Sequence, residues 1–169
     1  MNIFYLDHNP QRCARMHCDK HVVKMILEYA QLLCTAHHEA GSATEDMYRA
    51  THRNHPSAVW ARSGRYNYIW LYTLFCELLD EYRHRYGRVH ATSRLRESLA
   101  SIPPNCLFTQ PRTEVPQCMP DKFKVDNDPV TAYRNYYVGD KAYMAKWTKR
   151  NTPIWFSIGT AAEEHEIYV

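Results

Sequence analysis

The sequence has no long apolar run of the kind that crosses a membrane. None of its hydrophobic stretches approaches the roughly 20 residues that a transmembrane helix needs. Residues 1–7 are short and interrupted by Asp7, unlike a secretory signal. Internal repeats and low-complexity tracts are absent from the sequence as well. We therefore expect a cytoplasmic protein with no membrane partner.

Sequence motifs for metal binding are also absent. There are six cysteines, but no Cys-x-x-Cys pair and no His-Glu-x-x-His element. Several cysteines fall on apolar faces of expected helices, where a reduced thiol behaves as a small hydrophobe. We expect reduced cysteines and no cofactor. One alternative stays open, a zinc site built from these residues: Cys13, His17, Cys18 and His21, completed by His52 or His55.

The overall composition is that of one globular domain. Apolar residues make up 45% of the 169 residues and charged residues 23%, which is ordinary for a folded domain. The net charge of +3 does not by itself indicate nucleic acid. Thirteen tyrosines are many for this length. Tyrosine rings can line the edge of a core, or they can offer stacking faces and hydroxyls to a ligand.

Helical periodicity dominates the chain. Apolar residues at spacings of three and four predict long helices at 20–38 and 65–86, the second ended by Gly87. Asn9-Pro10 and Asp128-Pro129 each combine a capping side chain with a proline, which indicates a helix start. Shorter helical segments are predicted at 10–17, 57–62, 93–100 and 129–149, the last with a potential break at Gly139-Asp140 and an end before Pro153.

The remaining segments carry no helical period. Residues 2–6 alternate weakly and predict either a short strand or an extended segment. Five prolines punctuate the stretch from 103 to 125, which predicts a long ordered loop. Residues 160–169 are polar and predict a frayed tail. The expected fold is mainly α, a single compact helical domain over residues 1–169 with a proline-rich ordered loop and little or no sheet.

A stripe of polar side chains follows the helix predicted at 20–38. Its members recur at spacings of three and four and so share one face: His17, His21, Lys24, Glu28, Gln31, Thr35 and His38. A wholly polar face usually meets solvent. The stripe could instead border a cleft, because the rest of this helix is apolar over a wide arc. Histidine, amine and carboxylate groups within two turns are suited to proton chemistry.

Three further clusters are candidates for binding. Asn54 and His55 lie in a polar turn ahead of Trp60 and Arg62, and this turn either is a simple loop or reaches the stripe. The stretch 83–96 contains Arg85 and Arg88 and no acidic residue, which suits contact with phosphate. In the third cluster aromatic residues alternate with cations, a pattern that either packs helices or stacks nucleic-acid bases; it includes Tyr133, Arg134 and Tyr137.

With these residues in view, the sequence resembles the pyrimidine-dimer DNA glycosylase superfamily of endonuclease V-type repair enzymes. It is most similar to the small uncharacterised bacterial and phage members. The resemblance covers about half of the chain in three ordered blocks. These are Asp19-Lys20-His21-Val22-Val23-Lys24 leading to Leu27-Glu28 and Gln31-Leu32-Leu33; Asn54-His55-Pro56 leading to Trp60, Tyr68, Tyr72 and Glu81; and Tyr133-Arg134-Asn135 ahead of Pro153-Ile154-Trp155.

The resemblance implies an all-helical fold and an N-glycosylase directed at damaged or modified bases in DNA, with or without lyase activity. In the repair enzymes an N-terminal α-amine attacks the sugar and a helix glutamate assists, and Glu28 matches that glutamate by position. The amine matches less well: Asn2 follows Met1, whereas the repair enzymes have a small residue there. Lys20 or Lys24 could substitute for the amine only if burial lowered its pKa. Alternatively, Glu28 activates water, and His21 or His55 assists as an acid.

The expected site therefore contains two groups of residues. The catalytic group is Glu28, His21, Lys24, Met1 and Asn2. The substrate-binding group is His17, Lys20, Asn54, His55, Trp60, Arg62, Arg85, Arg88, Tyr133, Arg134 and Tyr137. The partner is DNA or a nucleotide, in a bacterial cell or a phage-infected host. Two other functions remain open, a non-catalytic binder of a nucleotide or modified base and a zinc-dependent hydrolase.

Overall fold

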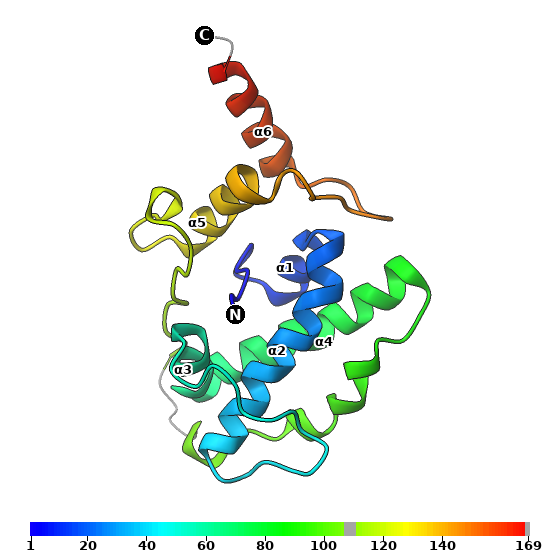
Figure 1. The fold of residues 1–169 in the computed structure, drawn as a ribbon, viewed down its shortest axis with the longest axis vertical. Helices are drawn as coiled ribbons and strands as arrows, with labels where there is room; N and C mark the ends of the chain where they lie inside the picture. The colour runs from blue at the N-terminus through cyan, green and yellow to red at the C-terminus, as the bar shows by residue number, and fades with distance from the viewer. Residues whose placement is uncertain (107–110, 168–169) are drawn as a thin grey trace.

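Two long helices, α2 (Asp19–Glu39) and α4 (Arg65–Tyr86), form the frame of the molecule (Figure 1). The structure is a computed structural model that describes residues 1–106 and 111–167. The short helices α1 (Pro10–Met16) and α3 (Pro56–Arg62) pack against this frame. No strand occurs within the described ranges. The prediction of a mainly α, single compact domain is confirmed.

The helix boundaries follow the local capping signals. Asn9 accepts a hydrogen bond from the Arg12 amide at 3.0 Å and starts α1. Asp128 does the same for the Thr131 amide, at 3.0 Å, and starts α5 (Pro129–Tyr136). Gly87 ends α4 in the left-handed conformation at φ 65°, which favours glycine because it has no Cβ. The predicted starts and the end of α4 are therefore confirmed.

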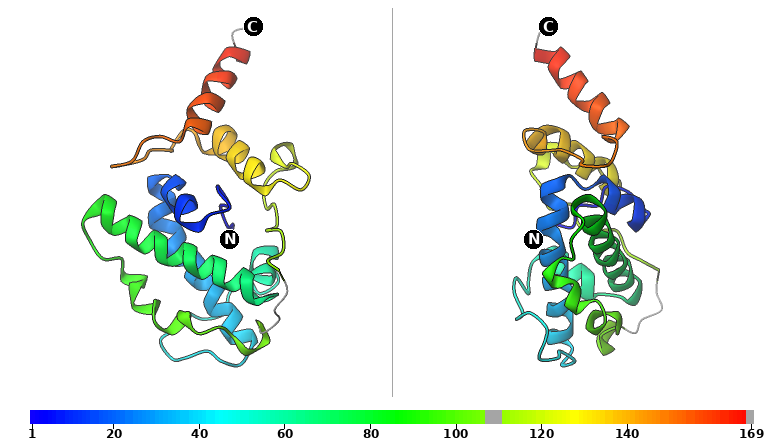
Figure 2. Two further views of the ribbon diagram at one scale, coloured as in Figure 1. Left: turned by 180° about the vertical axis from the view of Figure 1, so that it is seen from behind. Right: turned by 90° about the vertical axis from the view of Figure 1, so that its right-hand side faces the viewer.

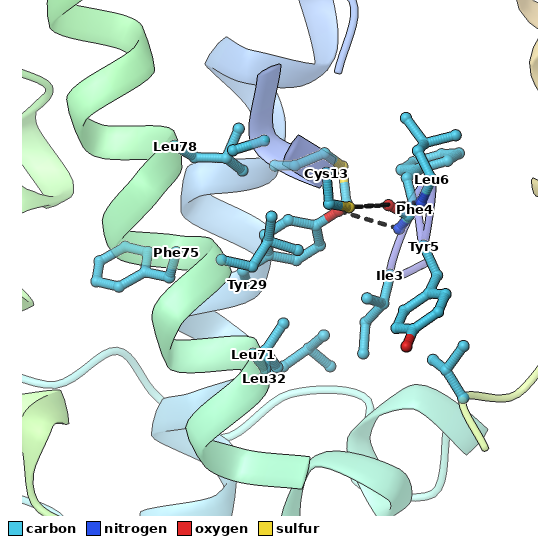
Figure 3. Close-up of a cluster of buried hydrophobic side chains, with 14 of the residues drawn as sticks. Ile3, Phe4, Tyr5, Leu6, Cys13, Tyr29, Leu32, Leu71, Phe75 and Leu78 are labelled. Carbon is cyan, nitrogen blue, oxygen red and sulfur yellow. Dashed lines mark hydrogen bonds between the residues drawn. The ribbon is translucent and has the colours of Figure 1, made fainter. Parts of the chain in front are cut away.

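The N-terminal segment is extended and forms part of the core. Ile3 and Leu6 are fully buried. The Phe4 amide donates to the Tyr29 hydroxyl of α2 at 3.0 Å, and the Arg134 guanidinium of α5 donates to the Leu6 carbonyl at 2.9 Å. Figure 3 shows Ile3 and Phe4 grouped around Tyr29 with apolar side chains of α4. The segment thus joins α2 to α5 without forming a sheet.

The region after α5 differs from the prediction. The helix runs only through the π-helical turn η5 (Tyr137–Lys141), residues 142–153 are irregular, and a separate helix α6 (Ile154–Ile167) follows. The predicted helix to 149 and the predicted tail from 160 are therefore wrong. The reason is that Pro153 precedes the first turn of a helix, where its missing N–H is not needed, rather than ending one.

Between α4 and α5 the regular structure consists of short 3₁₀ turns. The predicted helix at 93–100 is instead a pair of 3₁₀ turns, Ala91–Leu95 and Ser98–Ala100. The proline-rich loop contains two more such turns, Pro104–Cys106 and Asp121–Phe123. The part of that loop at 107–110, and the predicted tail at 168–169, lie outside the described residues. All six cysteines are free thiols. Among the described helices none is long and apolar enough to cross a membrane.

Candidate functional site

The polar stripe on α2 divides into a buried part and an accessible part. The stripe predicted from spacing loses His17, which lies before α2 as the extended residue that ends α1. Within α2, His21 and Thr35 are buried, whereas Glu28 is half-buried and Lys24 is exposed. The division arises because α4 packs on one side of α2 while the N-terminal segment and η5 cover another. Two apolar residues of α2 are exposed instead, Val23 and Leu27. The stripe is therefore neither a solvent face nor one continuous cleft.

His17 is held in the core between a carbonyl and a tyrosine. Its Nδ1 lies 2.7 Å from the Cys13 carbonyl oxygen, which can only accept, so Nδ1 carries the proton. Its Nε2 then accepts from the Tyr29 hydroxyl at 2.8 Å. Burial lowers the pKa of His17 to about 4, so the ring is neutral at pH 7. His17 is a structural residue, which corrects the expectation that it touches a ligand.

His21 forms a second buried histidine–tyrosine pair. Its Nδ1 lies 2.6 Å from the Tyr137 hydroxyl, and that hydroxyl accepts from the Cys18 amide at 3.3 Å. When the hydroxyl hydrogen is directed at Nδ1, the ring proton lies on Nε2. Phe4 stacks on the ring at 4.1 Å. Burial, together with the charges of His17, Lys141 and Lys24, lowers the pKa of His21 to about 3.

A ring with that pKa is neutral at pH 7 and cannot deliver a proton as an imidazolium acid. The expectation that His21 acts as a general acid is therefore corrected. As the Nε2–H tautomer it can still donate a hydrogen bond. Lys141 was not among the expected site residues, although its charge affects His21 and its ammonium lies 4.9 Å from the Tyr136 ring centre. Only the fold brings η5 beside α2, so sequence spacing gives no signal for this contact.

Glu28 is the carboxylate of the accessible part. Its side chain is 20% exposed, and Oε1 lies 3.8 Å from Nζ of Lys24, one helical turn earlier. The Lys24 side chain is 67% exposed and Lys20 is exposed as well. The burial that either lysine would need to serve as a neutral amine is therefore missing. Both instead place positive charge on the helix face that carries Glu28.

The start of the chain lies beside the same part of α2. Figures 1 and 2 place the N-terminus on the side of the middle of this helix. Met1 is half-buried against the core, and its α-amine is near enough that its charge, after burial, lowers the pKa of His55. Glu28 follows His21 by seven residues and shares its face, the face that the N-terminal segment covers. We group the Glu28–Lys24 pair of α2 with Met1 and His55, which lie near each other, and call the four residues the α2 site.

His55 also has a structural role. Its Nδ1 accepts from the Ser57 amide at 3.1 Å and caps α3, which leaves Nε2 as the ring atom that carries the proton. Its neighbour Asn54 is exposed, and Asn2 is half-buried. The residue before the turn at 52–56 contacts the stripe, since the Thr51 carbonyl accepts from the Thr35 hydroxyl at 3.2 Å.

Four of the expected binding residues are buried and bonded within the protein. Arg85 is buried among acceptors, Trp60 donates to the Thr113 carbonyl at 3.2 Å, and Tyr133 donates to the Pro116 carbonyl at 2.7 Å. Tyr137 is the partner of His21. Their burial corrects the expectation that they contact a ligand directly. A pattern of aromatics and cations does not show which side of a helix is covered.

The remaining expected binding residues lie away from the α2 site. Arg88 is exposed just beyond the end of α4, and Arg62 is half-buried at the end of α3. Arg134 is bonded to the N-terminal segment, and its guanidinium lies 5.3 Å from the Trp155 ring centre. It borders a groove of about 550 Å³ between α5 and α6. The structure therefore does not gather the predicted binding residues into one surface.

The proposed zinc ligands are not assembled. Within residues 1–106 and 111–167, no three His, Cys, Asp or Glu side chains are grouped to hold a metal ion. Both ring nitrogens of His17 are bonded to protein atoms, and the Cys13 thiol donates to the Phe4 carbonyl at 3.2 Å.

No protein-family model, curated protein or solved structure matches the chain.

Proposed function

We propose that this protein cleaves N-glycosidic bonds at damaged or modified bases in DNA, in the cytoplasm of a bacterium or a phage-infected cell. The observation that carries the proposal is the half-buried Glu28 carboxylate, which pairs with Lys24 at 3.8 Å on one face of α2. The Met1 α-amine lies close enough to His55 to lower its pKa. The resemblance to DNA glycosylases, in which a helix glutamate works beside an amine, supports the same function. Glu28 is the proposed catalytic carboxylate.

The charges around Glu28 support a polyanionic substrate. Lys20 and Lys24 are exposed on the same face of α2, and Lys141 approaches it from η5. Ammonium groups of this kind can neutralise backbone phosphates on either side of a target nucleotide. The overall charge of +3 is small, so this local arrangement, not the net charge, is what favours DNA.

The chemistry proposed for Glu28 is stabilisation of charge at the sugar. As the glycosidic bond breaks, positive charge develops on the sugar, and a fixed carboxylate stabilises it. The base leaves with the electron pair of the C1′–N bond and takes a proton from solvent. Attack at C1′ comes from water, which gives its proton to Glu28, or from the neutral Met1 α-amine, which loses its protons as the C1′–O4′ bond opens to leave a covalent imine. The neutral His21 contributes a hydrogen bond from Nε2, and no step needs a histidine acid.

Replacing Glu28 with glutamine tests the proposal. We expect base release from duplexes carrying a panel of damaged and modified bases to fall by at least about a hundredfold, the usual scale for loss of a group that acts in the transition state. Unfolding and DNA affinity should stay nearly unchanged, because glutamine keeps the shape of the side chain. The matched control is Glu39→Gln, which removes the charge of another partly exposed, ion-paired carboxylate on the same helix.

Three results separate the alternatives. Borohydride trapping of a protein–DNA adduct would identify the amine route, and its absence with normal base release would identify the water route. Tight binding of a nucleotide that is recovered intact, with no base release from any duplex, would favour the non-catalytic binder. Full activity of Glu28→Gln would remove the α2 site as the catalytic centre.

A further inference from the structure

Helix α6 projects from the body of the protein and leaves one face without a partner (Figures 1 and 2). Ile154 and Ile158 are 77% and 65% exposed, and Ala161 and His165 continue the same face at spacings of three and four. The opposite face attaches the helix, where Phe156 packs on Trp147 at 4.8 Å. The outward face is thus a narrow apolar seam of the kind that joins two helices.

The charges of α6 are unfavourable for a helix that stands alone. Glu163, Glu164 and Glu166 lie in its last turns, next to the negative end of the helix dipole, and its first turn has no acidic residue. Glu163 and Glu166 border the groove against α5, which leaves Glu164 at the edge of the outward face. A partner that stabilises this helix must therefore bring positive charge to its C-terminal half and apolar surface to its seam.

The chain itself carries a surface with these properties at the start of α6. A pocket of about 400 Å³ is lined by the apolar Met16, Pro153 and Ile154 and by three arginines: Arg12, Arg15 and Arg150. Arg12 pairs with Asp7 and Arg150 with Glu81, so Arg15 is the arginine whose charge is directed to a partner. Arg12 and Arg15 are exposed. We call this surface the arginine-rimmed pocket. It lies at one end of α6, and the acidic residues lie at the other.

We propose that α6 pairs in antiparallel orientation with α6 of a second copy of the chain. A helix of 14 residues is about 21 Å long, so an antiparallel partner spans the distance from the seam to the pocket. A twofold axis between Ile158 and Ala161 then sets each Ile158 against Ala161 of the second copy. The same operation brings Glu164 of each copy to the arginine-rimmed pocket of the other. Because the twofold axis makes the patch self-complementary, both helices gain the same apolar and charged contacts.

Sedimentation velocity of the full chain over a wide concentration range tests the pairing. We expect the fraction of chains in the dimer to rise with protein concentration, because the seam is small, and to fall at high salt, because the charges are exposed. Ile158→Asp should raise the dimer dissociation constant by more than about tenfold, because it places a charge in the seam. Val89→Asp is the matched control, since Val89 is a 68% exposed valine just after the C-terminal end of α4 and outside the seam.

Charge exchange tests the orientation. Glu164→Arg and Arg15→Glu should each weaken the dimer, and the double variant should recover most of the affinity, because both contacts are restored with reversed sign. Circular dichroism should be unchanged, since these side chains are exposed. A wild-type chain that stays monomeric at every concentration would overturn the proposal. So would dimers that tolerate Ile158→Asp, or a double variant weaker than either single variant.

Discussion

Replacing Arg85 with alanine is expected to lower the free energy of unfolding by about 3–5 kcal/mol, the range for removing one partner of a buried ion pair. The Arg85 side chain is fully buried and pairs with Glu81 at 2.8 Å and Asp19 at 3.0 Å. It also donates to the carbonyls of His17 and Arg15. Alanine would leave four acceptors with fewer donors, and two of them, the Glu81 carboxylate and the His17 carbonyl, are buried.

Urea denaturation followed by circular dichroism measures this loss. Arg83→Ala is the matched control, because Arg83 is exposed on the same helix, two residues earlier. We expect the control to change the free energy of unfolding by less than about 0.5 kcal/mol, as surface substitutions usually do. Equal small losses in both variants would show that the Arg85 contacts contribute little. The test is independent of any catalytic role.

Acid is expected to destabilise the fold well before its carboxylates are protonated. His17 has a pKa near 6.5 when unfolded and about 4 when folded, because burial opposes the charged ring. Between these values the unfolded state binds more protons, so stability is full above pH 6.5 and falls as the pH drops toward 4. This difference corresponds to about 3 kcal/mol for His17. His21, with a pKa of about 3, adds to the loss in the same direction.

The free energy of unfolding measured between pH 7 and pH 4 checks this expectation. NMR titration of the ring protons shows which histidines bind protons in the folded state. His17→Gln should reduce the slope over this range, since glutamine cannot be protonated, although it also loses the bond to Tyr29. A ring of His17 that titrates near pH 6.5 in the folded protein would contradict the assignment. Stability that does not change over this range would do the same.

The sequence predicts the elements whose signals are local. The boundaries of α4 agree with the prediction because the apolar period is long and Gly87 provides its own stop. The starts of α1 and α5 agree because each cap lies within three residues of the amide it binds. The sequence does not predict α6, because Phe156 is the one residue of Ile154–Ile167 buried against the body and a single residue gives no apolar period. Without that period, Pro153 predicts the end of the preceding helix and not the start of a new one.

The site was predictable only in part, for a related reason. Spacing shows that His21 and Glu28 share a face of α2, but not what covers that face. The cover comes from Phe4, which is 17 residues before His21, and from Tyr137, which is 116 residues after it. These contacts decide that His21 is buried and neutral while Glu28 keeps access to solvent. Polar residue types alone cannot separate the two environments.

The core position of the N-terminal segment has a consequence for synthesis of the protein. Leu6 receives its bond from Arg134, 128 residues later, and the Phe4 ring meets Tyr133 and Tyr137 of the same region. A ribosome adds about 5–20 residues per second, so the segment waits about 6–26 s for its partners. During this time Ile3, Phe4 and Leu6 are exposed on the nascent chain. The packing around His21, to which Phe4 and Tyr137 both contribute, therefore forms only after Tyr137 has been translated.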